Sequence, residues 1–414
     1  MAHREVATRR IVRHCCLVSG AIVAAAAGCA GDAPGRLTLA GREVFIQSPR
    51  PGVRVTAYAF YCRSTGPDMI SRSSEQTRSD VHDVTWQRFS GDNGRTWSPP
   101  AAIPTFTRLE NGTFRRYLCP GFVDPGTGIL ITMILQGTLP NDNPLEGMKH
   151  WTLRYALGRD GGRSFYYEAP VIQAGAEFSP EHPLPGVWTG KNGIMIGDTT
   201  CVPIRIRTGE ILQPVQICPV GPDGEYYNPG GGYTYHDSAV LIGRWNRYGT
   251  IDWRLSSLVK VDPARSTRGM LEPTIAEMPD GRILMVLRGS NDGKPDLPGY
   301  RWYAVSTNRG RSWSEPKPWT YTDGRPFFSP SSCSQLLRHS NGRIYWIGNI
   351  CEANPKGNLP RHPLVIGEVD RKSLLLIRET LCTIDERGPG DPETLQLSNF
   401  HAREDRVTHE IVVH

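Results

Sequence analysis

The sequence lacks the features that define several classes of protein. None of its ten cysteines forms a CxxC pair, and no spacing of His, Cys, Asp and Glu typical of metal ligands stands out. The formal net charge is only +6, and no basic run is interleaved with aromatic residues, so nothing indicates nucleic-acid binding. No apolar run approaches the roughly 20 residues that a membrane-spanning helix needs. We therefore expect no metal, no cofactor and no nucleic-acid partner.

Long helical periodicity is also missing, and the residues that replace it favour β structure. The chain of 414 residues contains 44 glycines and 34 prolines, and short apolar runs alternate with clusters of turn-forming residues. This pattern predicts many short strands and an all-β protein. The length exceeds that of a usual single domain, but repeat folds often do so, and no linker is visible between residues 41 and 414. We predict one domain there.

The first residues have the order of a bacterial export signal. Several arginines precede the apolar stretch Leu17–Ala27, and small residues lead to Cys29 in a sequence similar to a lipobox. A Thr-Arg-Arg triplet at residues 8–10 also resembles the twin-arginine signal. We predict a signal peptide over residues 1–28 and a tether over 29–40. The protein would be exported, as a periplasmic, secreted or lipid-anchored protein that contacts the membrane only through Cys29.

Seven cysteines follow Cys29, at positions 62, 119, 201, 218, 333, 351 and 382. In an exported protein some of them could form disulfides. Cys333 and Cys351 lie on two predicted successive strands, which makes them the first pair to consider. The alternative is that these cysteines are small buried hydrophobic residues.

A related turn sequence occurs four times. In each copy an Asp or Asn can hydrogen-bond the turn backbone, a Gly supplies positive φ, and an aromatic residue closes the segment. The copies are Ser90–Trp97, Gly158–Phe165, Ser306–Trp313 and a degenerate copy over Gly243–Trp253. Their wide spacing leaves room for about one four-stranded unit per copy.

This turn resembles the Asp-box, or BNR repeat, of the sialidase superfamily. The resemblance implies a six-bladed β-propeller of four-stranded antiparallel blades over residues 41–414. Its last blade would come from residues 395–414 and be closed by residues 44–49. It also implies an exo-acting glycoside hydrolase that binds the carboxylate of an acidic sugar through arginines. Its partner would be an acidic oligosaccharide or glycoconjugate, and we expect a monomer.

The family resemblance assigns roles to four positions. Glu272 begins one predicted strand and Arg288 ends the next, as do the family's glutamate that serves the nucleophile and its second carboxylate-binding arginine. Arg361, in the segment NLPRHP, matches the third arginine. Asp80, in SDVHDVTW, matches the acid/base residue, with Asp83 as its competitor.

Two parts of the family pattern are missing. The F-R-I-P motif of the first arginine is absent, so Arg50 or Arg54 would replace that arginine. The family's nucleophile is a tyrosine near the C-terminus, but no tyrosine follows Tyr345. His401 lies beside the position that this tyrosine would occupy.

Tyr233, Tyr235 and His236 suggest a second kind of chemistry. All three lie in the glycine-rich stretch GGGYTYHDS, which could fold over the mouth of the channel. A Tyr or His beside an arginine-bound uronate would suit a polysaccharide lyase, because it could abstract the proton next to the neutralised carboxylate. The sequence thus leaves two alternatives to a sialidase-type hydrolase. They are a lyase or divergent hydrolase acting on uronic-acid glycans, and a propeller that binds acidic glycans without catalysis.

Overall fold

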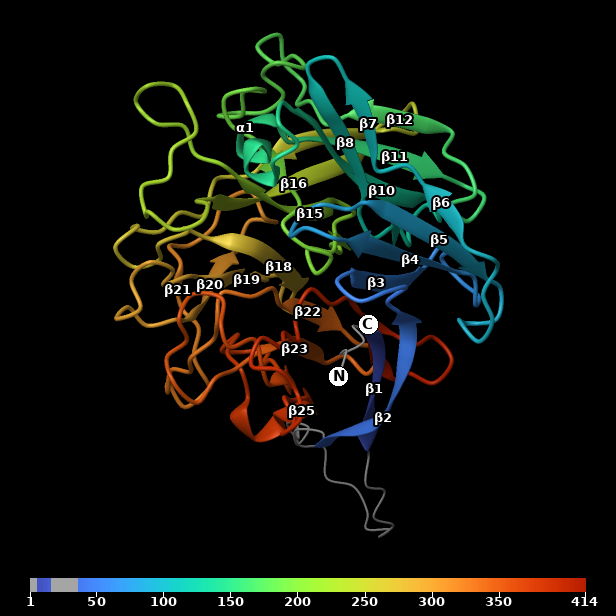
Figure 1. The fold of residues 1–414 in the computed structure, drawn as a ribbon, viewed down its shortest axis with the longest axis vertical. Coiled ribbons are helices and arrows are strands. Elements are labelled where there is room, and N and C mark those ends of the chain that lie inside the picture. The colour runs from blue at the N-terminus through green and yellow to red at the C-terminus, as the bar shows by residue number, and fades with distance from the viewer. Residues whose placement is uncertain (1–5, 16–35) are drawn as a thin grey trace.

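The computed structural model describes residues 6–15 and 36–414, which form an all-β propeller (Figure 1). Its antiparallel sheets are arranged around a common centre. Helical structure in the described residues is limited to α1 (Gly147–His150) and two short 3-10 turns, Pro144–Glu146 and Arg378–Thr380. The prediction of an all-β propeller is confirmed.

Five sheets are blades, and each takes its strands from one continuous stretch of chain. The first blade contains β3 (Arg54–Tyr61), β4 (Met69–Gln76), β5 (Val84–Ser90) and β6 (Ala101–Ile103). The second contains β7 (Phe106–Leu109), β8 (Gly112–Leu118), β9 (Phe122–Val123), β10 (Leu130–Leu139), β11 (Thr152–Gly158) and β12 (Tyr167–Pro170). The third contains β13 (Ile194–Met195), β14 (Ile204–Arg205), β15 (Ile211–Ile217), β16 (Asp237–Trp245) and β17 (Ile251–Leu255). The fourth contains β18 (Leu271–Glu277), β19 (Ile283–Arg288), β20 (Arg301–Ser306) and β21 (Lys317–Pro318). The fifth contains β22 (Gln335–Arg338), β23 (Ile344–Asn349), β24 (Leu364–Glu368) and β25 (Cys382–Asp385).

A further sheet combines both ends of the described chain. Its strand order is β2-β1-β27-β26, built from β1 (Val6–Cys15), β2 (Arg36–Gln47), β26 (Ala402–Glu404) and β27 (Ile411–Val413). The C-terminal strands are only three residues long, and the sheet is not made from one stretch of chain. The structure therefore has five clear blades rather than the predicted six. As predicted, residues 44–47 join the sheet of the C-terminal strands, although β1 lies between them.

Two other expectations concern the N-terminal segment and the cysteines. β1 lies within the predicted signal peptide and β2 begins within the predicted tether, while Leu17–Ala27 and Cys29 lie outside the described residues. The seven later cysteines are all free thiols, so the hypothesis of a Cys333–Cys351 disulfide is wrong and the alternative of buried small residues holds for most of them. No helix among the described residues is long and apolar enough to cross a membrane.

The fourth blade shows how strand register places the polar residues. β19 is buried along its whole length, as its continuous apolar run Ile283–Leu287 predicts. In the antiparallel ladder Leu271 is opposite Arg288, so the start of β18 and the end of β19 lie at one end of the blade. Ser306 pairs with Ile283 at the other end, where the Asp-box turn begins. We call the first end the mouth face and the second the Asp-box face.

The predicted repeats are hairpin turns on the Asp-box face. In the first copy, Asp92 accepts hydrogen bonds from the backbone N–H of Thr96 at 2.9 Å and from its hydroxyl at 2.6 Å. Gly94 has φ of 76°, the positive value that the turn requires. The turns of the other boxed blades likewise join the last two strands of each blade. Large apolar side chains, among them the fully buried Trp319 and Trp346, fill the space between neighbouring sheets.

Candidate active site

Glu272 and Arg288 form a buried ion pair on the mouth face. Nη1 of Arg288 lies 2.5 Å from Oε1 of Glu272, and each residue is only 7% exposed. Glu272 has φ of 42° at an irregularity in the β18–β19 ladder, a strained conformation for a residue with a side chain. The N–H of Glu272 donates to the side chain of Gln216 at 2.9 Å, which helps to hold this conformation. The sequence prediction that these two residues meet is confirmed.

The second carboxylate oxygen of Glu272 has no partner. Oε2 is buried and accepts no hydrogen bond within the described part of the chain. Arg288 is held in place by two further acceptors, because its Nε donates to Ser331 and its Nη2 to Asn358. A buried acceptor without a donor is unusual and is a common sign of a functional position. A ligand or water with a donor group could satisfy Oε2.

Arg361 approaches the same place from the loop between β23 and β24. Its Nη2 donates to the carbonyl of Ser331 at 3.0 Å, and its Nη1 lies 3.3 Å from the side-chain oxygen of Asn399. Nε of Arg361 is buried and makes no hydrogen bond to any described residue. Burial, and then the charge of Arg288, lower the pKa of Arg361. Arg361 and Arg288 are therefore close neighbours, as the family resemblance implies.

Arg268 is a third arginine of this group, and sequence reasoning missed it. Its Nη2 donates to the hydroxyl of Thr234 at 2.6 Å, while Nη1 has no acceptor among the described residues. Burial, and then the charge of Arg288, lower its pKa to about 10. The one local signal in the sequence is the Arg-Gly pair at residues 268–269, shortly before β18. Gly269 has φ of 71°, and a Cβ there would lie 2.1 Å from the carbonyl of His236, so only glycine fits.

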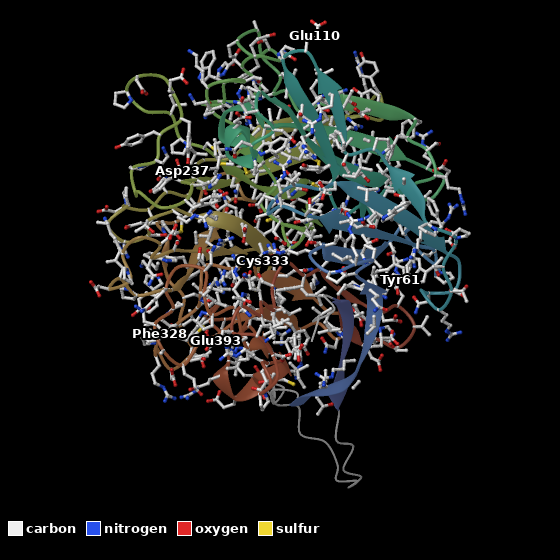
Figure 2. All side chains as sticks on the ribbon, in the orientation of Figure 1. Tyr61, Glu110, Asp237, Phe328, Cys333 and Glu393 are labelled. Carbon is white, nitrogen blue, oxygen red and sulfur yellow. The ribbon has the colours of Figure 1, made fainter. Side chains whose placement is uncertain are left out.

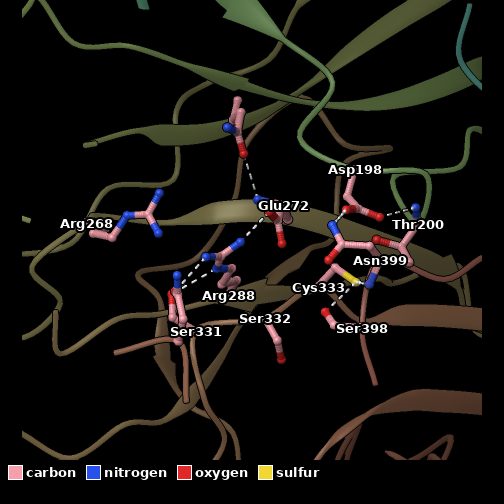
Figure 3. A network of polar contacts seen from close by, with 12 residues as sticks. Asp198, Thr200, Arg268, Glu272, Arg288, Ser331, Ser332, Cys333, Ser398 and Asn399 are labelled. Carbon is pink, nitrogen blue, oxygen red and sulfur yellow. Dashed lines mark hydrogen bonds and ion pairs between the residues drawn. The ribbon is translucent and has the colours of Figure 1, made fainter. Parts of the chain in front are cut away.

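Asp198 is the second residue that the sequence did not indicate. It lies between β13 and β14, and its carboxylate accepts from the hydroxyl of Thr199 and, at 2.7 Å, from the side-chain amide of Asn399. Burial, and then the nearby charge of Glu272, raise its pKa to about 7. Figure 3 shows Glu272 with Arg268 and Arg288 on one side and Asp198 on the other. No motif marks Asp198, since its stretch GDTTC resembles an ordinary polar turn.

These residues form one group, which we call the arginine–carboxylate cluster: Arg268, Arg288, Arg361, Glu272, Asp198 and Asn399. Cys333, near the middle of the molecule in Figure 2, lies against it, because its sulfur is 3.2 Å from the backbone nitrogen of Asn399. Arg301 lies fully buried behind the cluster. Four buried arginines thus surround two carboxylates, one of which titrates near neutral pH. The site has excess positive charge and would be stabilised by an anion.

Asp80 and Arg54 lie near the rim of the mouth face, outside the cluster. Asp80 is exposed on the loop after β4, and Arg54 is exposed at the first position of β3, opposite Gln76. The charge of Asp80 contributes, after burial, to a raised pKa of Tyr233. Its competitor Asp83 accepts from the backbone and hydroxyl of Thr77, which gives Asp83 a structural role. No described contact joins Arg54 to the cluster.

Tyr235, His236 and His401 differ from their predicted roles. The hydroxyl of Tyr235 is buried and donates to the carbonyl of Val261 at 2.9 Å, so Tyr235 is a core residue. His236 is 2% exposed, and burial, followed by the charge of Arg268, keeps its pKa well below the ordinary value. A neutral buried imidazole cannot bind a substrate carboxylate by charge.

His401 contacts the backbone of the segment that carries Asp198. Its Nδ1 lies 3.0 Å from the carbonyl of Thr199, and burial lowers its pKa to about 4. The ring therefore holds the segment that carries Asp198, and we expect it to stay neutral. Tyr233 is the tyrosine of this loop that faces the cluster, since it is half exposed and Arg268 lies over its ring at 5.6 Å. Among the described residues, no group of three or more His, Cys, Asp or Glu side chains is placed to hold a metal ion.

Comparison with known proteins gives a family and a fold. The profile described as BNR repeat-like domain matches residues 150–382, more than half of the chain. No curated protein matches the sequence. Three solved structures with similar folds are sialidases or a trans-sialidase, all at low sequence identity.

The NanB sialidase from Streptococcus pneumoniae superposes with a TM-score of 0.53 at 13% identity, over 90% of this chain and 66% of that one. The Hadza microbial sialidase Hz136 has a TM-score of 0.51 at 14% identity, and the match covers 86% of this chain and 66% of that one. The intramolecular trans-sialidase from Ruminococcus gnavus has a TM-score of 0.52 at 12% identity, and the match covers 84% of this chain and 87% of that one. The chain therefore spans less than two-thirds of the first two proteins, and the likeness at this identity concerns the fold.

Proposed function

Because the chain belongs to the BNR repeat-like domain family of sialidase-like propellers, we propose that it is an exo-acting glycoside hydrolase of the sialidase type. In this proposal Arg268, Arg288 and Arg361 bind the carboxylate of an acidic sugar. The supporting observation is the excess of buried positive charge around Glu272, which includes an arginine nitrogen without an acceptor. Arginine and carboxylate match as planar forks, which makes a sugar carboxylate a suitable counter-ion.

Glu272 and Asp80 would carry the chemistry that the family resemblance assigns to them. Glu272 lies among the arginines with one free carboxylate oxygen, while Asp80 lies at the rim, where it could exchange protons with solvent. Arg54 would add a rim contact to the same ligand. His401 would act on Asp198 through the Thr199 segment rather than on the sugar.

The experiment is turnover of fluorogenic glycosides by the full chain. The panel contains an α-sialoside, a hexuronoside and a neutral hexoside with the same leaving group. We expect hydrolysis of at least one acidic glycoside and not of the neutral one. Arg268→Ala should lower kcat/KM by about 10–100-fold, as expected when one charged hydrogen bond to the substrate is lost. The matched control is Arg247→Ala on the exposed turn after β16, which should keep the wild-type value. Equal turnover of the neutral sugar, or no turnover of any acidic glycoside, would contradict the proposal.

One observation favours a lyase as the second candidate. Tyr233 combines an exposed phenol with the neighbouring Arg268, an arrangement in which a tyrosine could abstract a proton beside an arginine-bound uronate. A lyase would produce an unsaturated uronate with a rise in ultraviolet absorbance, and Tyr233→Phe would abolish that rise. The third candidate, binding without catalysis, would show calorimetric binding of an acidic oligosaccharide and no product of either kind.

We also propose that the terminal sheet acts as a sixth blade and that the protein is exported as a monomer. The sheet lies between the fifth and first blades, because β26 contacts β22 while β1 and β2 contact β3. Cleavage before Cys29 would remove β1 and leave β27 to pair with another strand. The mass of the mature N-terminus tests export. The thermal stability of a chain that begins at Cys29 tests whether the sheet needs β1.

A further inference from the structure

Two carboxylates lie on the innermost segments of adjacent blades. Glu272 is the second residue of β18 in the fourth blade, and Asp198 lies between β13 and β14, which both pair with β15 of the third. The residue before Asp198 is in direct contact with Glu272: a Cβ on Gly197 would lie 2.7 Å from Cγ of Glu272. Glycine at position 197 thus lets the two blades bring these carboxylates together (Figure 3).

The two side chains have different surroundings. Arg288 forms an ion pair with Glu272, while Oε2 of Glu272 accepts no hydrogen bond from any described residue. Asp198 forms no ion pair with an arginine of the described chain, and the amide of Asn399 lies between it and Arg361. The other titratable groups that face it are those of Glu272, Cys201, Cys333 and, through the carbonyl of Thr199, His401. Glu272 therefore has a guanidinium partner and Asp198 does not, and a carboxyl without such a partner keeps its proton more readily.

We propose that Asp198 is the proton donor of the reaction and that Glu272 is its nucleophile, a pair that takes the place of the absent tyrosine. This inference rests on the proposed glycoside hydrolase function and assigns its chemistry to side chains of the cluster. The pair follows the scheme of most glycosidases, in which one carboxylic acid and one carboxylate flank the scissile bond. Burial, and then the charge of Glu272, raise the pKa of Asp198 to about 7, which agrees with a proton held at neutral pH.

Hydrolysis by this pair of carboxyl groups requires no reactant other than water. Asp198 gives its proton to the glycosidic oxygen as the bond from that oxygen to the anomeric carbon breaks, and the electron pair of the bond stays on the leaving alcohol. Oε2 of Glu272 forms a bond to the anomeric carbon. Water then attacks this carbon, its proton passes to Asp198, and the electron pair of the ester bond returns to Glu272. Both side chains end in their starting states.

The same arrangement favours one class of acidic sugar. A sialoside carries its carboxylate on the anomeric carbon, so the carboxylate of Glu272 would approach a carbon whose own carboxylate substituent repels it. A hexuronoside carries its carboxylate on the far side of the ring oxygen, where the three arginines could bind it without facing the nucleophile. We therefore expect a hexuronoside to be the better substrate.

The test compares aryl hexuronosides with a good and a poor leaving group. A general acid matters most when the leaving group is poor, so Asp198→Asn should lower kcat by about 10²–10⁴-fold on the poor one and far less on the good one. Glu272→Gln should lower kcat on both. On the poor leaving group, the wild-type kcat/KM should fall as the pH rises through about 7, and Asp198→Asn should lack this fall. Asp252→Asn on the outermost strand β17 is the matched control and should behave as wild type.

The outcomes separate the two proposals. If the wild type hydrolyses acidic glycosides but Asp198→Asn loses no more on the poor leaving group than on the good one, the inference about Asp198 is wrong and the proposed function remains. If Asp80→Asn instead shows the dependence on the leaving group, Asp80 is the proton donor and Asp198 is not. If the wild type hydrolyses no acidic glycoside, both proposals fail. Circular dichroism of each variant excludes loss of folding as the cause.

Discussion

The two faces of the propeller use similar residues in different ways. On the Asp-box face, Asp92 is half-buried and Asn308 is exposed, and their side chains are hydrogen-bonded within their own turns. On the mouth face, Glu272 and Arg361 are buried, and each has one polar atom with no partner in the part of the chain that the structure describes. The first arrangement can be complete in an isolated hairpin. The mouth-face arrangement requires residues from several blades, and its hydrogen bonds are still incomplete. This is the expected condition of a site that awaits a ligand.

The strain of the backbone differs in the same way. Positive φ in the Asp-box turns falls on glycine or on Asn93 and Arg309 beside it, where turns commonly place it. At the mouth it falls on Glu272 and Asn399, whose side chains belong to the cluster, and on Asp80 at the rim. The Asp-box turn of the fourth blade also combines positive φ, at Arg309, with a buried indole nitrogen, that of Trp313, which has no partner among the described residues. On the mouth face both features occur in one charged residue, Glu272, which supports the proposal that this face holds the functional site.

The largest expected effect comes from breaking the buried ion pair. Arg288→Ala should lower the free energy of unfolding by about 3–5 kcal/mol, because it leaves the charge of Glu272 buried without a counter-ion. The exposed pair Arg63–Asp68 near the Asp-box face is the comparison, and Arg63→Ala should cost less than about 1 kcal/mol. Urea unfolding measures both. Equal losses would show that the mouth pair has no special role in stability.

The second effect concerns pH and has opposite signs on the two faces. The raised pKa of Asp198 means that the folded protein binds more protons than the unfolded chain between the ordinary value of 3.8 and about 7. Its contribution to stability is therefore lost as the pH rises through this window. Relative to that of the wild type, the free energy of unfolding of Asp198→Asn should increase by about 1–3 kcal/mol between about pH 4 and about pH 8.

Asp92 should show the reverse dependence. The hydrogen bonds from Thr96 lower its pKa to about 2, so its contribution is present above the ordinary carboxyl pKa and is lost as the pH falls toward 2. Urea midpoints of wild type, Asp198→Asn and Asp92→Asn across this pH range check both signs. A difference between wild type and Asp198→Asn that does not change with pH would contradict the assignment of a raised pKa.

A third prediction concerns the Asp-box turn of the fourth blade. Asn308→Ala removes two hydrogen bonds to Ser312 and should cost about 1–2 kcal/mol of stability without changing kcat/KM. Asn308→Asp restores the residue found in the first two copies and should cost less. Thermal unfolding and the fluorogenic assay measure the two properties. A loss of activity at wild-type stability would show that the Asp-box face takes part in the reaction.

The smallest effect separates the two tyrosines of the glycine-rich loop. Tyr235→Phe leaves the buried carbonyl of Val261 without its donor and should cost about 1 kcal/mol, with unchanged kcat. Tyr233→Phe removes an exposed hydroxyl and should change stability by less than about 0.5 kcal/mol. Denaturation curves and initial rates for both variants provide the measurement. A large loss of kcat for Tyr235→Phe would mean that this loop rearranges when substrate binds.

Part of the site was visible in the sequence because it is local. Glu272 and Arg288 are joined by one strand, one turn and one strand, so the apolar run and the turn residues already place them at one end of a blade. Arg361 was found by its resemblance to the family segment. Nothing in the stretch GGGYTYHDS shows which of its two tyrosine rings faces the core, so the sequence does not distinguish Tyr233 from Tyr235.

The sequence by itself determined the class of fold, the repeated turns and the pairing of Glu272 with Arg288, because each depends on residues within a single blade. Only the tertiary structure decided that Arg268 and Asp198 join them, since those contacts form when separate blades close around a centre. The tertiary structure also determines the number of clear blades, because the terminal sheet combines strands from both ends of the described chain. Burial decided the protonation of the site: desolvation by neighbouring blades raises the pKa of Asp198 and keeps His401 neutral, and no local pattern encodes it.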